Sequence, residues 1–119
     1  IVNSLLNSPY LKGKIDFYYE NKLVTPSWFG LSVKILASTK GLKNIIIKKL
    51  QRNGIETRPI ISGNFANQPA AKIYGLTKNK KFPNTDSVYD KSFFIGLPSK
   101  QIKNDYLKKI VSAFEKSFK

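Results

Sequence analysis

The 119-residue chain contains no cysteine, no histidine and no methionine. Without cysteine it can form neither a disulfide framework nor a thiolate metal site. Without histidine it lacks the commonest metal ligand and the commonest general base. We therefore expect no catalytic residue and no metal site in this sequence. Because no methionine is present, we also expect Ile1 to follow earlier residues of a longer or processed protein.

Acidic residues are scarce as well. Seven Asp and Glu stand against 21 Lys and Arg, which gives a net charge of +14. The seven acids form no pair with the spacing of metal ligands. Such a charge excess favours anionic partners, including phosphates, nucleotides, nucleic acid and acidic proteins. Most of the cations are lysines spread along the whole chain, a distribution that is equally typical of a solvated surface.

Long apolar runs are missing too. The run at residues 45–47 is far too short to span a bilayer, and no basic segment followed by an apolar core opens the chain. Hydrophobic residues nevertheless make up 41% of the sequence, enough to build a core and too many for a disordered chain. We therefore expect one compact domain, located in the cytoplasm, with no membrane contact.

The hydrophobic pattern predicts an alternation of strands and helices. A helix tail is expected near residues 1–6 and an edge strand at 15–19. Further strands are predicted at 28–35, 55–61 and 92–97. Helices are predicted from Lys40 or Gly41 to residue 52, closed by Asn53-Gly54, and from a cap at Ser99 onward. Short helices are predicted at 68–74 and at 88–91, the latter capped by Asn84, Thr85 or Asp86. Pro59 places its strand at an edge of the sheet. This order predicts an α/β fold (an α+β sandwich), in which a small, mainly antiparallel sheet of about three to four strands carries helices on one face.

The segment from residue 54 to residue 70 concentrates turn formers, amides and one of the two arginines. Arg58 can donate two parallel hydrogen bonds to a phosphate or carboxylate. Asn64 and Gln68 offer both donors and acceptors, which sugar hydroxyls require, and Gly63 allows a close backbone approach. The alternative is an ordinary surface turn in which Arg58 pairs with Glu56 or Asp86.

Trp28 raises a similar choice. An exposed Trp can stack on a sugar or a base, whereas a single Trp at a strand start more often packs in the core or at its rim. No neighbouring residue activates Ser27 as a nucleophile, and no lysine is marked as the buried, reactive amine of a Schiff base.

Several separated motifs follow one another in a recognisable order. They are Pro26–Leu31, Gly54–Pro59, Ser62–Phe65 with Gln68–Ala70, Phe82–Asn84 and Phe93–Pro98. Over residues 24–118 this order resembles the C-terminal small domain of the DegT/DnrJ/EryC1/StrS family of sugar aminotransferases. The similarity is greatest to the branch that contains the nucleotide-hexulose 3-dehydrases.

The resemblance implies a pyridoxal-phosphate (PLP) enzyme of fold type I that acts on nucleotide-linked keto-sugars. It places the cofactor on a large N-terminal domain absent from this sequence, and the active site at a homodimer interface. No cofactor is then expected on this chain alone. Residues 1–24 would be a linker and 25–119 the small domain. Carried over, Arg58 would neutralise substrate phosphate or orient the sugar, Asn64 and Gln68 would bind hydroxyls, and Trp28 would complete the substrate site.

One departure from the family pattern is informative. Many family aminotransferases have a His in the loop after the Thr-Arg-Pro strand, where this chain has Ser62-Gly63-Asn64. The resemblance therefore favours the dehydrase-like branch and leaves transamination or C-3 dehydration open. Two alternatives remain: a basic nucleic-acid-binding module, for which no recognisable motif is present, and a protein-interaction module.

Overall fold

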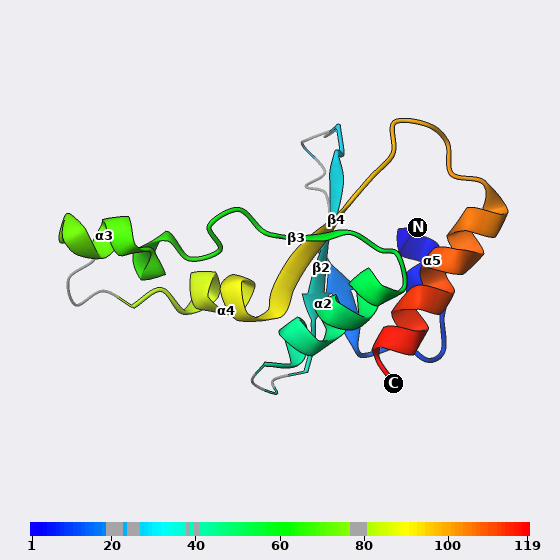
Figure 1. The fold of residues 1–119 in the computed structure, drawn as a ribbon, viewed down its shortest axis with the longest axis horizontal. Helices are drawn as coiled ribbons and strands as arrows, with labels where there is room; N and C mark the ends of the chain where they lie inside the picture. Colours follow the sequence, from blue (N-terminus) through cyan, green and yellow to red (C-terminus); the bar gives the residue numbers. More distant parts are fainter. Residues whose placement is uncertain (19–22, 24–26, 38, 40, 77–80) are drawn as a thin grey trace.

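The computed structural model describes residues 1–18, 23, 27–37, 39, 41–76 and 81–119 (Figure 1). In this part of the chain, antiparallel strands form one sheet in the order β1-β2-β4-β3. The strands are β1 (Ile15–Phe17), β2 (Gly30–Ile35), β3 (Thr57–Pro59) and β4 (Ser92–Gly96). The predicted α/β fold with a small antiparallel sheet is thus confirmed. The expected strand end at residue 19, the possible helix start at residue 40 and the domain boundary at 24–25 lie outside the described residues.

Period-two alternation in β2 and β4 places one row of side chains in the core. Val33 of β2 lies opposite Phe93 of β4, and Leu31 lies opposite Ile95. All four are buried in one hydrophobic cluster, because alternate residues of a strand point to the same face. On β1, Ile15 and Phe17 add to this cluster from the far side of β2, and on β3 Thr57 continues the row beside Ile95.

Two long helices cover this face of the sheet. They are α2 (Leu42–Arg52) and α5 (Asn104–Ser117), which pack against each other. Each helix contributes apolar residues at helical spacing to the core cluster: Ile46 and Leu50 from α2, Ile110 and Phe114 from α5. The short N-terminal helix α1 (Val2–Leu6) packs against α5 and β1. Residues 1–17 therefore share the core of the rest of the chain, and the expected linker at 1–24 stays a prediction.

Local signals set most helix ends. Gly54, with φ 80°, follows α2, and the Ile55 N–H bonds to the Leu50 carbonyl as the sequence predicts for a glycine-terminated helix. The last helix begins later than expected, since Lys103 rather than Ser99 is its N-cap. The Lys103 carbonyl accepts from the Tyr106 and Leu107 N–H groups. This start puts Asp105 in the first turn, where a carboxylate is favoured.

The segment between β3 and β4 differs most from expectation. The strand predicted at 55–61 is only Thr57–Pro59, and it lies at the sheet edge, as Pro59 indicates. The helix α4 spans Pro83–Lys91 rather than 88–91, because Pro83 occupies its first turn and needs no N–H partner there. The residues expected to cap it, Asn84 to Asp86, therefore lie inside the helix.

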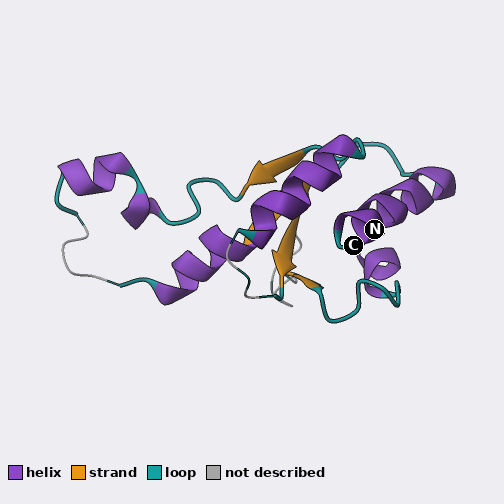
Figure 2. Ribbon diagram, turned by 60° about the horizontal axis from the view of Figure 1, so that its bottom comes forward, coloured by secondary structure: helices purple, strands orange, loops and turns teal. Residues whose placement is uncertain are grey.

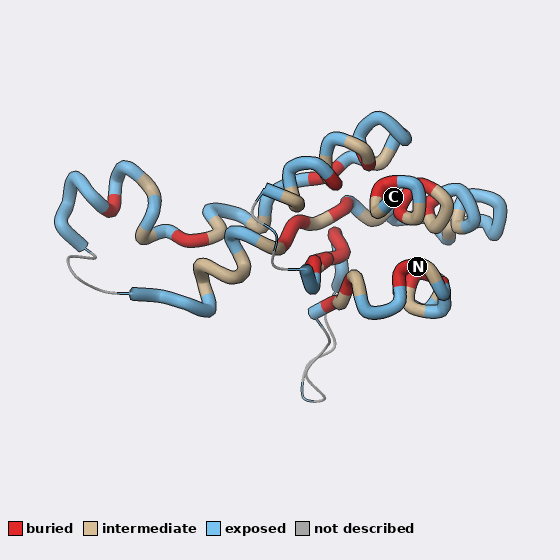
Figure 3. Tube along the Cα trace, turned by 90° about the horizontal axis from the view of Figure 1, so that it is seen from below, coloured by how far each residue is buried: buried red, intermediate tan, exposed pale blue. Residues whose placement is uncertain are grey.

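Residues 60–76 and 81–91 form an arm that extends away from the sheet (Figures 1 and 2). Its outgoing limb carries the 3-10 turn η1 (Phe65–Asn67) and the short helix α3 (Pro69–Ile73), and α4 returns directly into β4. In Figure 3 the buried stretches gather in the sheet and its covering helices, while most of the arm is exposed. The remaining part of the molecule is called the body below.

Among the helices that the structure describes, none is both long and apolar enough to cross a bilayer. The described residues also contain no group of three or more Asp or Glu side chains that could hold a metal ion.

Candidate functional site

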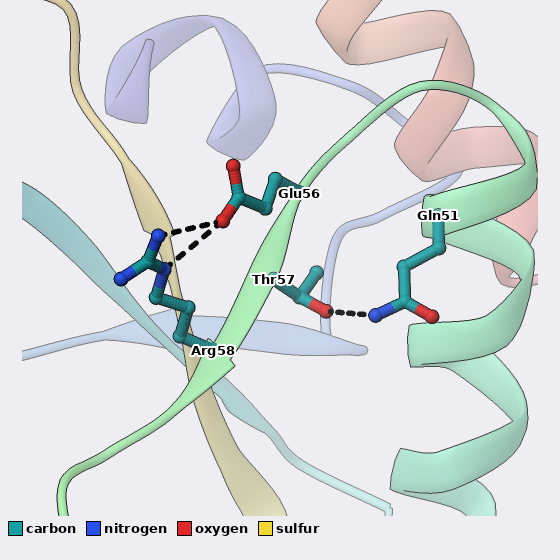
Figure 4. Close-up of polar contacts among 4 residues, drawn as sticks. All are labelled: Gln51, Glu56, Thr57 and Arg58. Atoms are coloured by element: carbon teal, nitrogen blue, oxygen red, sulfur yellow. Dashed lines mark hydrogen bonds and ion pairs between the residues drawn. The ribbon is translucent and has the colours of Figure 1, made fainter.

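The edge strand β3 presents different chemistry on its two sides (Figure 4). Thr57 points toward α2, where its hydroxyl accepts a hydrogen bond of 3.3 Å from the Gln51 side-chain amide. Arg58 points the other way. In the sheet register Arg58 lies opposite Phe94 of β4, which in turn lies opposite Ser32 of β2. The guanidinium therefore belongs to the face of the sheet that α2 and α5 leave uncovered.

Arg58 forms an ion pair with Glu56, one of the two partners proposed from the sequence. Its Nε and Nη2 atoms donate to the same Glu56 oxygen at 3.0 and 2.9 Å (Figure 4). The two side chains are 66% and 75% exposed, and pairs in such high dielectric contribute little to stability. A phosphate or carboxylate of a ligand can therefore displace the Glu56 side chain from Arg58 at a small cost in free energy.

The Asn64 side chain holds the arm together through partly buried hydrogen bonds. It is nearly inaccessible, with the residue only 3% exposed. The amide nitrogen donates to Asp86 Oδ1 of α4 at 2.5 Å, and the amide oxygen accepts from the Ala66 N–H at 2.9 Å. Asn67 donates to the same Asp86 oxygen at 3.3 Å. Asp86, rather than pairing with Arg58, thus ties the two limbs of the arm together.

The turn between β3 and η1 is fixed by glycine and by a side-chain amide. Gly63 has φ 60°, and a Cβ at this position would lie 2.6 Å from the Tyr89 ring, so no other residue fits without displacing it. Gln68 donates to the Ser62 carbonyl at 3.2 Å, across the same turn. The amide-rich loop predicted from the sequence is therefore a compact turn that packs on α4.

Trp28 lies in another part of the molecule. It is 45% exposed and lines a groove of about 730 Å³ with residues of α1, β1, β2 and the β4–α5 connection. The groove wall is mainly apolar and includes Phe17, Leu31 and Leu97. No lining residue comes from β3 or the arm. The structure thus separates the four predicted site residues: Arg58 on the sheet edge, Asn64 and Gln68 in the arm, and Trp28 in this groove.

Lys43 is a residue that sequence reasoning missed. Burial lowers the pKa of its ammonium group from the ordinary lysine value, an effect partly opposed by the carboxylate of Asp90. The ammonium donates to the Tyr89 carbonyl and lies 5.1 Å from the centre of the Tyr89 ring. It lines a cavity of about 410 Å³ between α2 and α4. Only the fold brings residues 43 and 89 together, so no local sequence signal could reveal this contact.

Comparisons with known proteins point to one group of relatives. No protein-family model matches the chain. RfbH, a lipopolysaccharide biosynthesis protein of Salmonella typhimurium, is 32% identical over 95 residues, which are 78% of this chain. A GDP-4-keto-6-deoxy-D-mannose 3-dehydratase of Yersinia pseudotuberculosis is 33% identical over 83 residues, 66% of this chain. The chain spans 21% of the length of each of these two relatives.

The fold has a counterpart of known structure. An E. coli GDP-4-keto-6-deoxy-D-mannose-3-dehydratase with bound hydrated PLP matches 98% of this chain with a TM-score of 0.66 and 20% identity. The match covers 28% of that protein, in its C-terminal region. The chain therefore has the α/β fold of the C-terminal region of this dehydratase. Its homologues are of the DegT/DnrJ/EryC1/StrS type, which confirms the resemblance given by the sequence motifs.

Proposed function

We propose that this chain is the C-terminal, substrate-facing part of a PLP-dependent enzyme that removes the C-3 oxygen of a nucleotide-linked keto-sugar. The observation that carries the proposal is the agreement between relatives: the matched dehydratases act on a GDP-linked keto-sugar, and RfbH is a lipopolysaccharide biosynthesis protein. We place the product in deoxysugar and polysaccharide synthesis in the cytoplasm. Dehydration is preferred to transamination because the curated relatives described above include a dehydratase and the chain has no histidine.

The proposed substrate contact is Arg58. Its guanidinium lies on the uncovered face of the sheet, and a phosphate can replace Glu56 because the existing pair is solvent-exposed. A planar fork of N–H donors suits a diphosphate. Gln68 is the next candidate. Among the described residues, its side chain has one hydrogen bond, from the amide nitrogen to the Ser62 carbonyl, and its amide oxygen can accept from a ligand. Asn64 contributes indirectly, because it holds the turn that carries Gln68. Trp28 is proposed to stack its ring on another part of the substrate or on a neighbouring chain.

We propose that the described residues hold no PLP. A Schiff-base lysine must be buried and reactive, and Lys43 comes nearest because burial lowers its pKa. Its ammonium, however, is engaged by the Tyr89 carbonyl and ring. We propose that the cofactor belongs to a large domain outside this sequence, that residues 25–119 are the small domain beside it, and that two copies share each active site.

Arg58 can be tested with the 119-residue chain itself. We expect GDP to bind weakly, and Arg58→Ala to weaken this binding by at least about tenfold, because losing even one hydrogen bond to a charged group removes about 1.5–3 kcal/mol. Titration followed by ¹H–¹⁵N NMR measures the affinity and maps the site. Glu56→Gln releases the guanidinium and should strengthen binding.

Arg52→Ala is the matched control. It removes the only other arginine, which is exposed near the end of α2, and changes the net charge equally. If both arginine variants weaken GDP binding to the same extent, the assignment of Arg58 is wrong and charge alone explains binding. Incubation with PLP checks the cofactor assignment separately: stoichiometric uptake, seen as a saturable visible absorbance band, would show that this chain holds the cofactor.

A further inference from the structure

A second candidate binding site lies on the helical side of the body. The C-terminal end of α5, the exposed edge of α2 and residues 14 and 37 surround a groove of about 290 Å³. Its walls are mainly apolar and include Ile45, Ile46 and Phe118. Ile45 is exposed although the adjacent Ile46 of α2 is buried in the core. The groove shares no residue with β3, the arm or the Trp28 groove.

Three lysines stand around the groove, from three separate parts of the sequence. They are Lys14 before β1, Lys49 on α2 and Lys119 after α5. Lys14 and Lys119 lie against the same Tyr10 ring, with their ammonium nitrogens 3.4 and 5.7 Å from its centre. This ring attracts both ammonium groups, and an anion bound in the groove would interact favourably with their charges.

No acidic side chain of the described residues supplies such an anion. Neither Asp nor Glu is among the described residues that line the groove, and none of the three lysines forms an ion pair with a described acidic side chain. The nearest acid along α5 is Glu115, which accepts a hydrogen bond of 2.6 Å from the Ser8 hydroxyl. The negative end of the α5 dipole attracts lysines by itself, but it accounts neither for Lys14 and Lys49 nor for the exposed apolar floor.

We propose that this lysine-rimmed groove binds a small amphiphilic anion, a compact apolar body of one or two rings that carries a carboxylate, sulfonate or phosphate. The groove volume of about 290 Å³ sets the size of the ligand, because a dry cavity of about 150 Å³ accepts a single benzene ring. The apolar wall takes the body of the ligand, and the ammonium groups take its charge. This site is separate from the proposed sugar-nucleotide contact and does not depend on it.

Naphthalene-1-sulfonate and its uncharged analogue 1-naphthalenemethanol form a matched pair of probes. We expect the sulfonate to shift the amide NMR signals of Ile45, Lys49 and Phe118 in a saturable manner, and the alcohol to bind several-fold more weakly. Lys14→Gln and Lys49→Gln should each weaken sulfonate binding about two- to fivefold, the range for exposed charge pairs. Ile45→Ser should weaken both probes, since it removes the apolar floor.

Lys72→Gln is the control, because it removes one charge from α3 in the arm. Equal weakening by Lys72→Gln and Lys49→Gln would overturn the proposal, as would equal affinity for the two probes. Shifts centred on Leu31 and Leu97, with a change in Trp28 fluorescence, would place the probe in the other groove and also contradict it. So would binding to anionic phospholipid vesicles or to an acidic peptide with no binding of the sulfonate.

Discussion

The body and the arm are stabilised in different ways. Every residue of the hydrophobic core cluster lies in the sheet, its covering helices or the N-terminal segment, and none lies between residues 60 and 91. In the arm, by contrast, Ala71 is the buried apolar residue of the described part, while Ile61, Ile73 and Tyr74 are largely exposed. The body is therefore held by burial of apolar area, and the arm by hydrogen bonds around Asp86 and by a glycine turn.

This difference matters for function. A segment with few buried apolar contacts opens locally at low cost, and binding loops are commonly built from such segments. The arm carries the two amides predicted to face the substrate and also a row of exposed apolar side chains. An arm of this kind can adjust to a partner surface, while the body keeps β3 and Arg58 at a fixed position. The predictions below test this division, beginning with the largest effect.

Truncating the core should be far more costly than truncating the arm. Phe93→Ala removes a fully buried ring from β4, and we expect a loss of about 3–5 kcal/mol in the free energy of unfolding. Ile73→Ala in α3, where the side chain is 78% exposed, should change it by no more than about 0.5 kcal/mol. Urea denaturation followed by circular dichroism measures both. A large effect of the Ile73 variant would show that the arm belongs to the cooperative core.

Asp86→Ala should open the arm and leave the body folded. The change removes the acceptor for Asn64 and Asn67 and leaves the buried Asn64 amide unpaired, which costs about 1–3 kcal/mol. Amide hydrogen exchange should then accelerate in residues 60–76 and stay slow in β2 and β4. Asn84→Ala, at an exposed position two residues earlier on α4, is the control. Equal acceleration in the body would contradict the division.

Lys43 reports on the junction of the two regions, since it lies on α2 of the body and bonds to Tyr89 of the arm. Because burial lowers its pKa, the folded state binds its proton less tightly than the unfolded chain does. This lysine should therefore add stability as the pH rises through its lowered pKa toward the model value of 10.5. Titration of ¹³C-methylated lysines by NMR should find the pKa of Lys43 below the ordinary lysine value. In the Asp86→Ala variant its pKa should move back toward the ordinary value, and an unchanged pKa would mean that the junction survives.

Much of the body could be predicted from the sequence because its elements carry local, redundant signals. The alternation from Leu31 to Ile35, the helical spacing in α2 and the Asn53-Gly54 end each specify one structure. Pro59 correctly indicated an edge strand. The start of α5 was predicted wrongly because Ser99 is a good capping residue in isolation. In the structure the first helical turn is closed by hydrogen bonds to the Lys103 carbonyl.

The arm was harder to predict because its contacts join residues distant in sequence. Asp86 was considered as a helix cap or as a partner of Arg58, yet it accepts from two asparagines about twenty residues away in the chain. The motif around Gly63, Asn64 and Gln68 was recognised as unusual, and the structure shows that it forms one turn. The sequence could not show that Trp28 lies apart from this turn, because that separation is set by the order of strands in the sheet.

The short edge strands have a consequence for how the molecule behaves in a crowded solution. Both borders of the sheet, β1 and β3, are only three residues long, and β3 ends in a proline with a charged residue beside it. A proline has no N–H to offer to an approaching strand, and a charged side chain disfavours close stacking. An extended strand from another molecule therefore cannot readily pair with the β3 border of the sheet. At the β3 border, the same tripeptide that presents Arg58 thus opposes runaway cross-β assembly, the usual hazard of an open sheet.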